Sequence, residues 1–321
     1  MEGLWLERGE LAFRGDIPPP EPPAGEALVR VRLAGICGTD LELVKGYYPY
    51  SGIPGHEFVG EIVKAPDAPV RCGQRVVGEI NAVCGECRTC RSGLPRHCRR
   101  RTVLGIAGRH GAFAEYLTLP LDNLIEAPPS LADSEAVFAE PLAAALEIQE
   151  QVRVGPSDRV LLIGAGRLGQ LIAQTLVLTG CELVVVVRHE PQRKILRARG
   201  IACIEEEEVR LPEADLVIEA SGVPQGLQLA LRAVRPGGTV VLKSTHKDET
   251  SVNFSSIVVN EIRLVGSRCG PFPPALRLLE RRRVETAPLV TATLPLTSAL
   301  EAFDLAARPG ALKVLLRMPG E

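Results

Sequence analysis

Four cysteines lie close together between residues 84 and 98, in a segment rich in glycine, arginine and polar residues. Their spacing, C-x2-C-x2-C-x7-C, favours a zinc site over disulfides. Four thiolates complete a tetrahedral site and leave no position for a substrate, so a zinc ion bound there is expected to hold a loop in shape. The cluster consists of Cys84, Cys87, Cys90 and Cys98. Any catalytic group must therefore lie elsewhere.

The residues around the last of these cysteines, PRHCRRR at 95–101, are basic. Zinc ribbons that bind nucleic acid carry such runs. The alternative that we favour is a solvated loop whose positive charge offsets a dianionic zinc–tetrathiolate group.

A glycine motif, GAGRLG, follows an apolar run and precedes a predicted helix. Gly164 permits a tight turn, Gly166 lets the backbone approach a pyrophosphate, and Gly169 allows close packing of helix and strand. The free N–H groups of the helix N-terminus, which includes Arg167 and Leu168, favour an anion. Because further strand–helix units follow, the motif predicts a dinucleotide site.

The end of the next strand decides which dinucleotide is preferred. A carboxylate about 20 residues after the glycine motif is typical of NAD binding, because it accepts the ribose 2′-hydroxyl. Here the chain has Arg188 and His189, with Arg193 one helical turn further on. Guanidinium groups pair with a 2′-phosphate, so we predict NADP in preference to NAD; the alternative is that these arginines are surface charges. The acidic run 205–209 is interpreted as a solvated loop or helix start.

A second set of metal-ligating residue types is dispersed. AGICGTD contains Cys37, Thr39 and Asp40, IPGHEFVG contains His56 and Glu57, and FAEPLA contains Glu140. Each has an ordinary interpretation when taken alone. A single cysteine is often a small buried hydrophobe, a single histidine often sits in a loop, and a glutamate at a helix start is favoured by the helix dipole.

The predicted elements fall into three stretches. Strands at 27–36, 58–65, 74–80 and 113–119 favour an antiparallel, barrel-like domain. From about residue 134 a helix to 152, with Pro141 near its start or at a kink, leads into alternating strands and helices up to 267, which favours a parallel doubly wound sheet. A helix at 297–310 and a strand at 311–318 close the chain, and this tail is expected to return to the first domain.

These motifs occur in one order: C-G-T-D, G-H-E, the four-cysteine segment, E-P-L-A, G-A-G-R-L-G and K-V-L-L. Over essentially its whole length the chain resembles the zinc-dependent medium-chain alcohol/polyol dehydrogenases. The resemblance implies an α/β protein in which a GroES-like β-barrel catalytic domain is interrupted by a Rossmann domain, with the active site in the cleft between them. We expect the catalytic domain at 1–140, with a structural zinc lobe at 84–98. The Rossmann domain is expected at 141–268, and 269–321 returns to the catalytic domain.

The resemblance also assigns the dispersed residues. Cys37 and His56 match the catalytic zinc ligands, and Glu140 occupies the position of a third, as in polyol-type members. Thiolate, neutral imidazole and one carboxylate neutralise Zn2+, so Glu57 is expected nearby and to ligate when substrate or water leaves. Asp40 is expected to accept the N–H of His56 and to fix its tautomer.

The same resemblance implies hydride transfer between a primary or secondary alcohol, with polyols favoured, and NAD(P). Thr39 is expected to accept the proton of the alcohol. Where many members carry a proton-relaying histidine this chain has Glu42, so the relay is expected through Glu42, or through Tyr47 or Tyr48, which alternatively only line the pocket. Lys313 matches a residue that contacts the cofactor phosphates, with a surface lysine as the alternative.

Composition bounds the remaining possibilities. The 321-residue chain has a formal net charge of −2 and no apolar run of about 18 residues, which indicates neither a polyanionic partner nor a membrane span. The first residues do not read as a signal peptide, so we expect a cytoplasmic enzyme with two zinc ions per chain, a homodimer or homotetramer that pairs through 260–267. The other function classes considered are a zinc-free quinone-oxidoreductase-type reductase and a nucleic-acid-binding or regulatory protein with a relict Rossmann fold.

Overall fold

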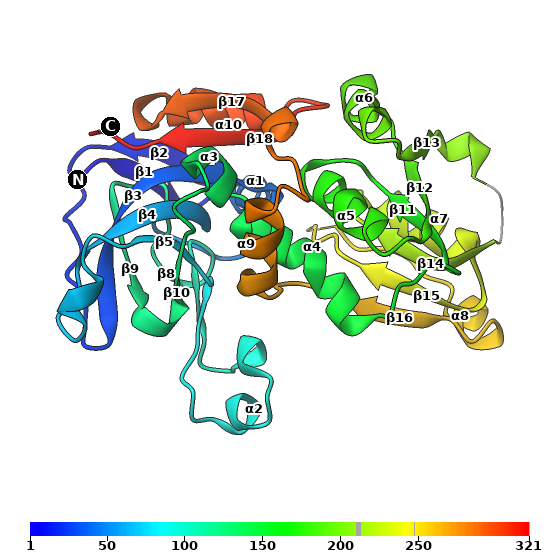
Figure 1. Ribbon diagram of the computed structural model, residues 1–321, viewed down its shortest axis with the longest axis horizontal. Coiled ribbons are helices and arrows are strands. Elements are labelled where there is room, and N and C mark those ends of the chain that lie inside the picture. The colour runs from blue at the N-terminus through cyan, green and yellow to red at the C-terminus, as the bar shows by residue number, and fades with distance from the viewer. Residues whose placement is uncertain (210–212, 247, 321) are drawn as a thin grey trace. The chain divides into compact units, whose positions relative to one another are not determined.

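The computed structural model describes residues 1–209, 213–246 and 248–320. The chain forms two compact units (Figure 1). Unit 1 comprises Met1–Glu140, Phe272–Arg308 and the chain from Lys313 onward; unit 2 comprises Pro141–Pro271 and Pro309–Leu312. The chain therefore passes from unit 1 into unit 2 and back again.

A mixed sheet of seven strands organises unit 1, with the order β10-β5-β4-β3-β18-β17 and β9 paired with β3. Its long central strand carries buried apolar residues at alternate positions and continuously at its end. The strands are β3 (Glu26–Ile36), β4 (Glu57–Lys64), β5 (Arg75–Gly78), β9 (Tyr116–Pro120), β10 (Leu124–Glu126), β17 (Val290–Pro295) and β18 (Lys313–Arg317). Near the end of the chain, β18 pairs antiparallel with β3 and so joins the sheet of unit 1.

Smaller elements surround this sheet. The hairpin β1 (Gly3–Glu7) and β2 (Glu10–Arg14) opens the chain, and helix α1 (Gly38–Val44) follows β3 directly. The four-cysteine lobe contains helix α2 (Arg88–Arg91) and lies beside a sheet of β6 (Asn81–Ala82), β7 (Thr102–Leu104) and β8 (Gly108–Arg109). In Figure 1 the lobe projects away from the seven-stranded sheet. The later part of unit 1 adds α9 (Phe272–Glu280) and α10 (Ala299–Ala307).

The predicted single helix over 134–152 is wrong. The structure has two helices, α3 (Asp133–Ala136) and α4 (Ala139–Gln151). The break falls at Val137 and Phe138, whose side chains are both buried. Pro141 is the third residue of α4, where its missing N–H costs nothing because first-turn donors have no partner inside the helix.

Unit 2 contains six parallel strands in the order β13-β12-β11-β14-β15-β16. In chain order this is 3-2-1-4-5-6, the doubly wound order, whose ligand crevice lies outside the carboxyl ends of the neighbouring strands β11 and β14, where the strand order reverses. The strands are β11 (Arg159–Ile163), β12 (Glu182–Val186), β13 (Ala202–Ile204), β14 (Ala214–Glu219), β15 (Val234–Leu242) and β16 (Arg263–Gly266). The helices that follow α4 are α5 (Arg167–Val177), α6 (Glu190–Ala198), α7 (Pro224–Ala233) and α8 (Phe254–Val259). The predicted parallel sheet is confirmed.

The core of unit 2 explains why these segments form a sheet with packed helices. Val217 and Val240 of the central strands are fully buried in one cluster with Leu229 and Ala230 of α7. Apolar runs of this kind suit strands that are covered on both faces.

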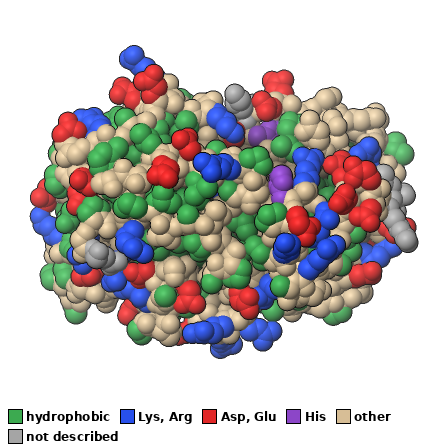
Figure 2. Space-filling view, turned by 90° about the horizontal axis from the view of Figure 1, so that it is seen from above, with side chains coloured by type: hydrophobic (Ala, Val, Ile, Leu, Met, Phe, Trp, Pro, Cys, Tyr) green, Lys and Arg blue, Asp and Glu red, His purple; other side chains and the backbone are tan. Residues whose placement is uncertain are grey.

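Within the described residues, no helix has both the length and the apolar character needed to span a membrane. The face drawn in Figure 2 carries acidic and basic side chains interspersed among neutral ones. This mixture agrees with the formal net charge of −2.

Candidate metal centres and cofactor site

The four cysteine sulfurs of the lobe lie at the corners of a small tetrahedron. Four of the six Sγ–Sγ distances are 3.5 Å for Cys87–Cys90 and Cys84–Cys98, 3.8 Å for Cys87–Cys98 and 4.0 Å for Cys84–Cys90, and all four sulfurs lie within 4.8 Å of one another. A tetrahedral zinc ion with Zn–S bonds of 2.3 Å requires S–S separations of about 3.8 Å. The residues therefore fit a zinc ion, and they leave no position for a further ligand.

The electrostatics of the lobe favour a cation at its centre. Hydrogen bonding from the backbone of Cys87 lowers the pKa of Cys84 to about 6, which makes it a thiolate near neutral pH. Partial burial, with the neighbouring thiols, raises the pKa of Cys90 to about 12. All four sulfurs can be thiolates together only if a cation offsets their charge.

The second set of ligand types is assembled by the ends of two neighbouring strands. Strand β3 ends at Ile36, and Cys37 caps the N-terminus of α1. The Cys37 backbone N–H donates to Asp40 Oδ2 over 2.8 Å, which fixes the turn that presents the cysteine. His56 immediately precedes β4, and Asp40 Oδ1 lies 3.2 Å from His56 Nδ1. These two buried atoms lack hydrogen-bond alignment and have no other partner among the described residues.

The structure brings Cys37, His56 and Glu57 together, with one ligand atom of each within 4.8 Å of the others. His56 and Glu57 are buried, while Cys37 is half-buried. Burial alone would lower the pKa of His56, but the negative charges of Asp40 and Cys37 outweigh it and raise that pKa well above its usual value. The site thus attracts positive charge, and its thiolate, imidazole and carboxylate donors suit zinc.

Glu57 is held from its far side by a lysine, an arrangement that sequence reasoning missed. In the sheet Gly35 of β3 stands between Glu57 of β4 and strand β18, which begins at Lys313. A Cβ at Gly35 would lie 2.5 Å from Glu57 Oε2, so the glycine leaves space for the carboxylate. Lys313 Nζ donates to Glu57 Oε2 over 2.5 Å, and both side chains are buried. Glu57 Oε1 is buried and has no partner among the described residues.

Glu140 is not part of the group formed by Cys37, His56 and Glu57, although the charges of His56 and Glu57 affect its pKa. Burial raises the pKa of its carboxyl to about 7; the charge of His56 acts to lower this pKa and the charge of Glu57 acts to raise it. The structure therefore places Glu140 in the electrostatic neighbourhood of the centre but does not bring its oxygens as close as those of Glu57.

The residues expected to move protons lie on α1 and just after it. Thr39 Oγ1 is 3.9 Å from Cys37 Sγ, so its hydroxyl adjoins the candidate zinc ligand. The carboxylate of Glu42 is 2.7 Å from Lys45 Nζ, and the side chain of Tyr48 is 47% exposed. Tyr50 was not predicted from the sequence. Its hydroxyl lies within hydrogen-bond distance of the carbonyl oxygens of Ile53 and Arg109, and burial raises the pKa of this hydroxyl.

The glycine turn of unit 2 has the geometry that the motif predicts. A Cβ at Gly169 would lie 2.1 Å from the carbonyl oxygen of Gly164, and Gly164 itself has φ +103° and packs against Ala220. A Cβ at Gly166 would meet nothing within 4 Å. Gly164 and Gly169 therefore serve packing, whereas Gly166 leaves open space at the N-terminus of α5, the kind of position that can hold an anion.

The other predicted cofactor residues surround this turn within unit 2. Arg167 Nε donates to the carbonyl of Leu312, and Leu168 is half-buried. His189 caps α6, while Arg188 and Arg193 lie at the carboxyl end of β12. Both arginines are paired with glutamates of the acidic run that the sequence analysis interpreted as solvated.

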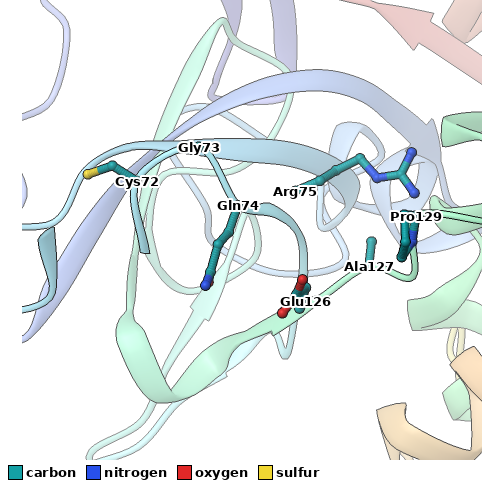
Figure 3. Close-up of a pocket in the computed structure, with 7 residues that line it drawn as sticks. All are labelled: Cys72, Gly73, Gln74, Arg75, Glu126, Ala127 and Pro129. Atoms are coloured by element: carbon teal, nitrogen blue, oxygen red, sulfur yellow. The ribbon is translucent and has the colours of Figure 1, made fainter. Parts of the chain in front are cut away.

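A hollow of about 540 Å3 lies away from all of these residues (Figure 3). It is lined by Cys72, Gly73, Gln74, Arg75, Glu126, Ala127 and Pro129. Figure 3 shows the Arg75 side chain reaching toward Pro129, and its guanidinium donates to the carbonyls of Pro128 and Leu131 and to Asp133. No predicted site residue lines this hollow.

Comparison of the sequence with family models and with known proteins identifies related proteins. A model of the alcohol dehydrogenase GroES-like domain matches residues 23–129, and a model described as zinc-binding dehydrogenase matches residues 168–281. The chain is 30% identical to D-arabinitol dehydrogenase 1 of Uromyces fabae over 315 residues, which is 91% of this chain and 90% of that protein.

Solved structures agree with this result. A zinc-binding dehydrogenase from Sinorhizobium meliloti 1021, bound to NADP, is 28% identical with a TM-score of 0.90 and 98% coverage of both chains. The alcohol dehydrogenase rspB of E. coli CFT073, complexed with NADH, is 29% identical with a TM-score of 0.89 and 99% coverage of both. The chain belongs to the zinc-dependent medium-chain dehydrogenase/reductase family, the family of alcohol and polyol dehydrogenases.

Proposed function

We propose that this protein interconverts an alcohol, preferably a polyol or another secondary alcohol, and its carbonyl product, with zinc in unit 1 and NADP preferred over NAD in unit 2. One observation carries the proposal: ligand atoms of Cys37, His56 and Glu57, drawn from two strand ends, lie within 4.8 Å of one another. Cys37 is half-buried, so it is the member of this group that is most accessible from outside.

When bound, zinc supplies Lewis-acid polarisation of the substrate oxygen, and the nicotinamide supplies the redox chemistry. Cys37 and His56 hold the metal. Asp40, 3.2 Å from His56 Nδ1, keeps the proton on that nitrogen and so leaves Nε2 free to ligate.

Two carboxylates compete to be the third ligand. Lys313 already offsets the charge of Glu57, whereas burial raises the pKa of Glu140 to about 7, so a cation beside it would favour its ionised form. This difference supports Glu140 as the resting ligand, with Cys37 and Glu140 together neutralising Zn2+. The free Oε1 of Glu57 then supports its role as a ligand that enters when substrate or water leaves.

Thr39 is the residue that we propose takes the proton of the alcohol, since its hydroxyl adjoins Cys37. Beyond Thr39 the path divides. The Glu42 carboxylate forms an ion pair with Lys45, and Tyr48 is 47% exposed. We propose that one of these two residues passes the proton from Thr39 to solvent. We keep both as relay candidates.

In unit 2 we propose that Gly164, Gly166 and Gly169, with the N–H groups at Arg167 and Leu168, hold the dinucleotide pyrophosphate. The open space at Gly166 supports this assignment. Arg188, His189 and Arg193 surround the adenosine end, where two guanidinium groups favour a 2′-phosphate. The buried Lys313 ammonium donates to Glu57. This contact supports a role for Lys313 in positioning Glu57, and it favours that role rather than a contact between Lys313 and the cofactor phosphates.

The test combines metal analysis with a substrate panel assayed in parallel with NADP and NAD. The expected result is two zinc ions per chain, one of which is lost in Cys37→Ser together with activity. One zinc per chain in fully active protein contradicts the proposal, and fully active protein without zinc identifies a zinc-free reductase. Salt-dependent DNA binding without dinucleotide binding identifies a nucleic-acid-binding protein.

We also propose that two copies of the chain pair through β16. This strand lies at the edge of its sheet, and the adjoining helix α8 exposes Phe254, Val258 and Val259 by 72%, 73% and 79%. Burying such residues in a self-association is favourable. Sedimentation of wild type and Val258→Lys distinguishes dimer, tetramer and monomer, and a monomeric wild type contradicts the proposal.

The described cysteines form no disulfide. Thiolate zinc ligands persist where the thiols stay reduced, so we place the protein in the cytoplasm. A fluorescent fusion observed in cells tests this location.

A further inference from the structure

Arg188 and Arg193 pair with glutamates at the point where the adenosine end of a dinucleotide is expected. Arg193 Nε lies 3.8 Å from Glu190 Oε2 of its own helix, and each arginine also has a partner in the acidic run. Arg193 Nη2 donates to Glu205 Oε1 over 2.9 Å and to the carbonyl of Val187 over 2.9 Å. Arg188 Nη2 donates to Glu206 Oε2 over 3.2 Å. The arginines follow strand β12 and the glutamates follow its parallel neighbour β13, so the sheet itself brings the four charges to one edge.

The acidic turn is built so that its carboxylates stay beside the guanidinium groups. Glu205 caps a 3-10 turn at Glu206–Glu208, and the backbone N–H of Glu205 donates to Glu208 Oε2 over 2.7 Å. Arg193 is anchored in turn, since its side chain is only 15% exposed. The backbone of the turn and the anchored Arg193 therefore position the Arg193–Glu205 pair, whereas the Arg188–Glu206 pair joins two more exposed side chains.

We propose that Glu205 and Glu206 are specificity-determining residues that limit the preference for NADP by competing with its 2′-phosphate for Arg193 and Arg188. This proposal rests on the proposed function of unit 2. A dianionic phosphate entering this edge must displace the carboxylates from the guanidinium groups and then remain close to two negative charges. NAD carries no phosphate at that position, so the same carboxylates do not oppose it.

The glutamates and the 2′-phosphate compete for the arginines on nearly equal terms, because the arginine–glutamate pairs are partly exposed. Arg188 and Glu206 have side-chain exposures of 60% and 35%, and Glu205 is 58% exposed. Exposed pairs contribute little net free energy, so a phosphate can replace them. Without the two glutamates the site is expected to select NADP strongly; with them it accepts both dinucleotides.

The test measures the Kd of NADPH and of NADH for the zinc-loaded protein, from the fluorescence of the bound reduced nicotinamide. Glu205→Gln and Glu206→Gln remove the competing charges. Each is expected to tighten NADPH binding about 3-fold and the double variant about 10-fold, while NADH changes less than about 2-fold. The gain is expected to shrink at high salt, because the charges are solvent-accessible.

Glu207→Gln is the matched control. It removes the same charge from the same turn, and within the described residues Glu207 makes no recorded ion pair. A second control combines Glu206→Gln with Arg188→Ala, in which the gain for NADPH should vanish.

The outcomes separate cleanly. An equal gain in Glu207→Gln, or no gain in the double variant, overturns the inference while leaving the proposed function intact. Failure of wild type and variants to bind either dinucleotide overturns the proposed function itself.

Discussion

The two candidate metal centres of unit 1 use similar donor atoms in opposite ways. The lobe takes four sulfurs from 15 consecutive residues, and their separations of 3.5–4.0 Å already match a closed tetrahedron. The second centre takes Cys37 and the His56–Glu57 pair from two strand ends, and its remaining partners, Glu140 and Lys313, come from much further along the chain. A local cluster suits a structural ion, whereas a dispersed one leaves space for substrate and brings in competing charges.

Breaking the lobe should produce the largest change. In Cys98→Ser a fully buried ligand is lost, and we expect one zinc per chain and a free energy of unfolding lower by at least about 3 kcal/mol, since structural zinc contributes ~10–16 kcal/mol of binding free energy. Metal analysis and thermal unfolding measure both effects. Cys72→Ser, at an exposed cysteine outside either centre, is the control. Full zinc content in Cys98→Ser would contradict the lobe assignment.

Breaking the second centre should affect activity more than folding. For His56→Gln we expect kcat/KM to fall by roughly 10³-fold, because metal polarisation of the substrate oxygen is worth several kcal/mol. The lobe zinc should stay, with Tm within a few degrees of wild type. Steady-state kinetics with metal analysis tests this, with His97→Gln at an exposed lobe histidine as control. An unchanged kcat/KM would contradict the assignment of the second centre as the site of a catalytic zinc.

Removing the lysine behind the second centre should expose how its charges are balanced. Lys313→Met leaves Glu57 buried without a counter-charge, which should lower the free energy of unfolding by about 3–5 kcal/mol in metal-free protein. In zinc-loaded protein the loss should be smaller, because the cation is near enough to compensate. Chemical unfolding with and without a chelator measures the difference. Glu57→Gln combined with Lys313→Met should recover stability, and an equal loss in both metal states would show that Glu57 does not sense the metal.

The smallest change is expected from the residue that orients the imidazole. Asp40→Asn keeps the shape but removes the charge beside His56, which should weaken zinc binding at the second centre about 10- to 100-fold. The lobe should be unaffected. Competition with a chromophoric chelator resolves the two sites, and a loss shared by both would mean that Asp40 acts on the fold as a whole.

Local patterns allowed much of this structure to be predicted from the sequence. The cysteine spacing and the glycine motif each lie within one short segment, so residue types and spacing were sufficient to predict a compact cluster and a tight turn. The parallel sheet followed from apolar strands alternating with helices. The helix over 134–152 was predicted too long because its periodicity continues across Val137 and Phe138, two buried residues at which the chain changes direction.

Charge pairing across strands could not be predicted in this way. The Glu57–Lys313 contact joins residues 256 positions apart and depends on the register of β4, β3 and β18. The run at 205–209 is largely exposed, in agreement with its interpretation as a solvated loop or helix start. Its pairs with Arg188 and Arg193 could not be predicted, because nothing in the sequence places β13 beside β12. Gly35 offered a signal in retrospect, since a glycine inside a long strand often marks a place where another group approaches closely.

The contact between Glu57 and Lys313 also constrains how the protein is made. A ribosome releases Glu57 long before Lys313, and both segments of unit 2, Pro141–Pro271 and Pro309–Leu312, emerge in the interval. Until β18 arrives, the early strands hold a carboxylate that cannot be buried without cost, so the first half of the sheet must wait, partly open, while the nucleotide-binding half has its chance to fold. Nascent chains arrested before and after residue 313 should therefore differ sharply in protease resistance near residue 57.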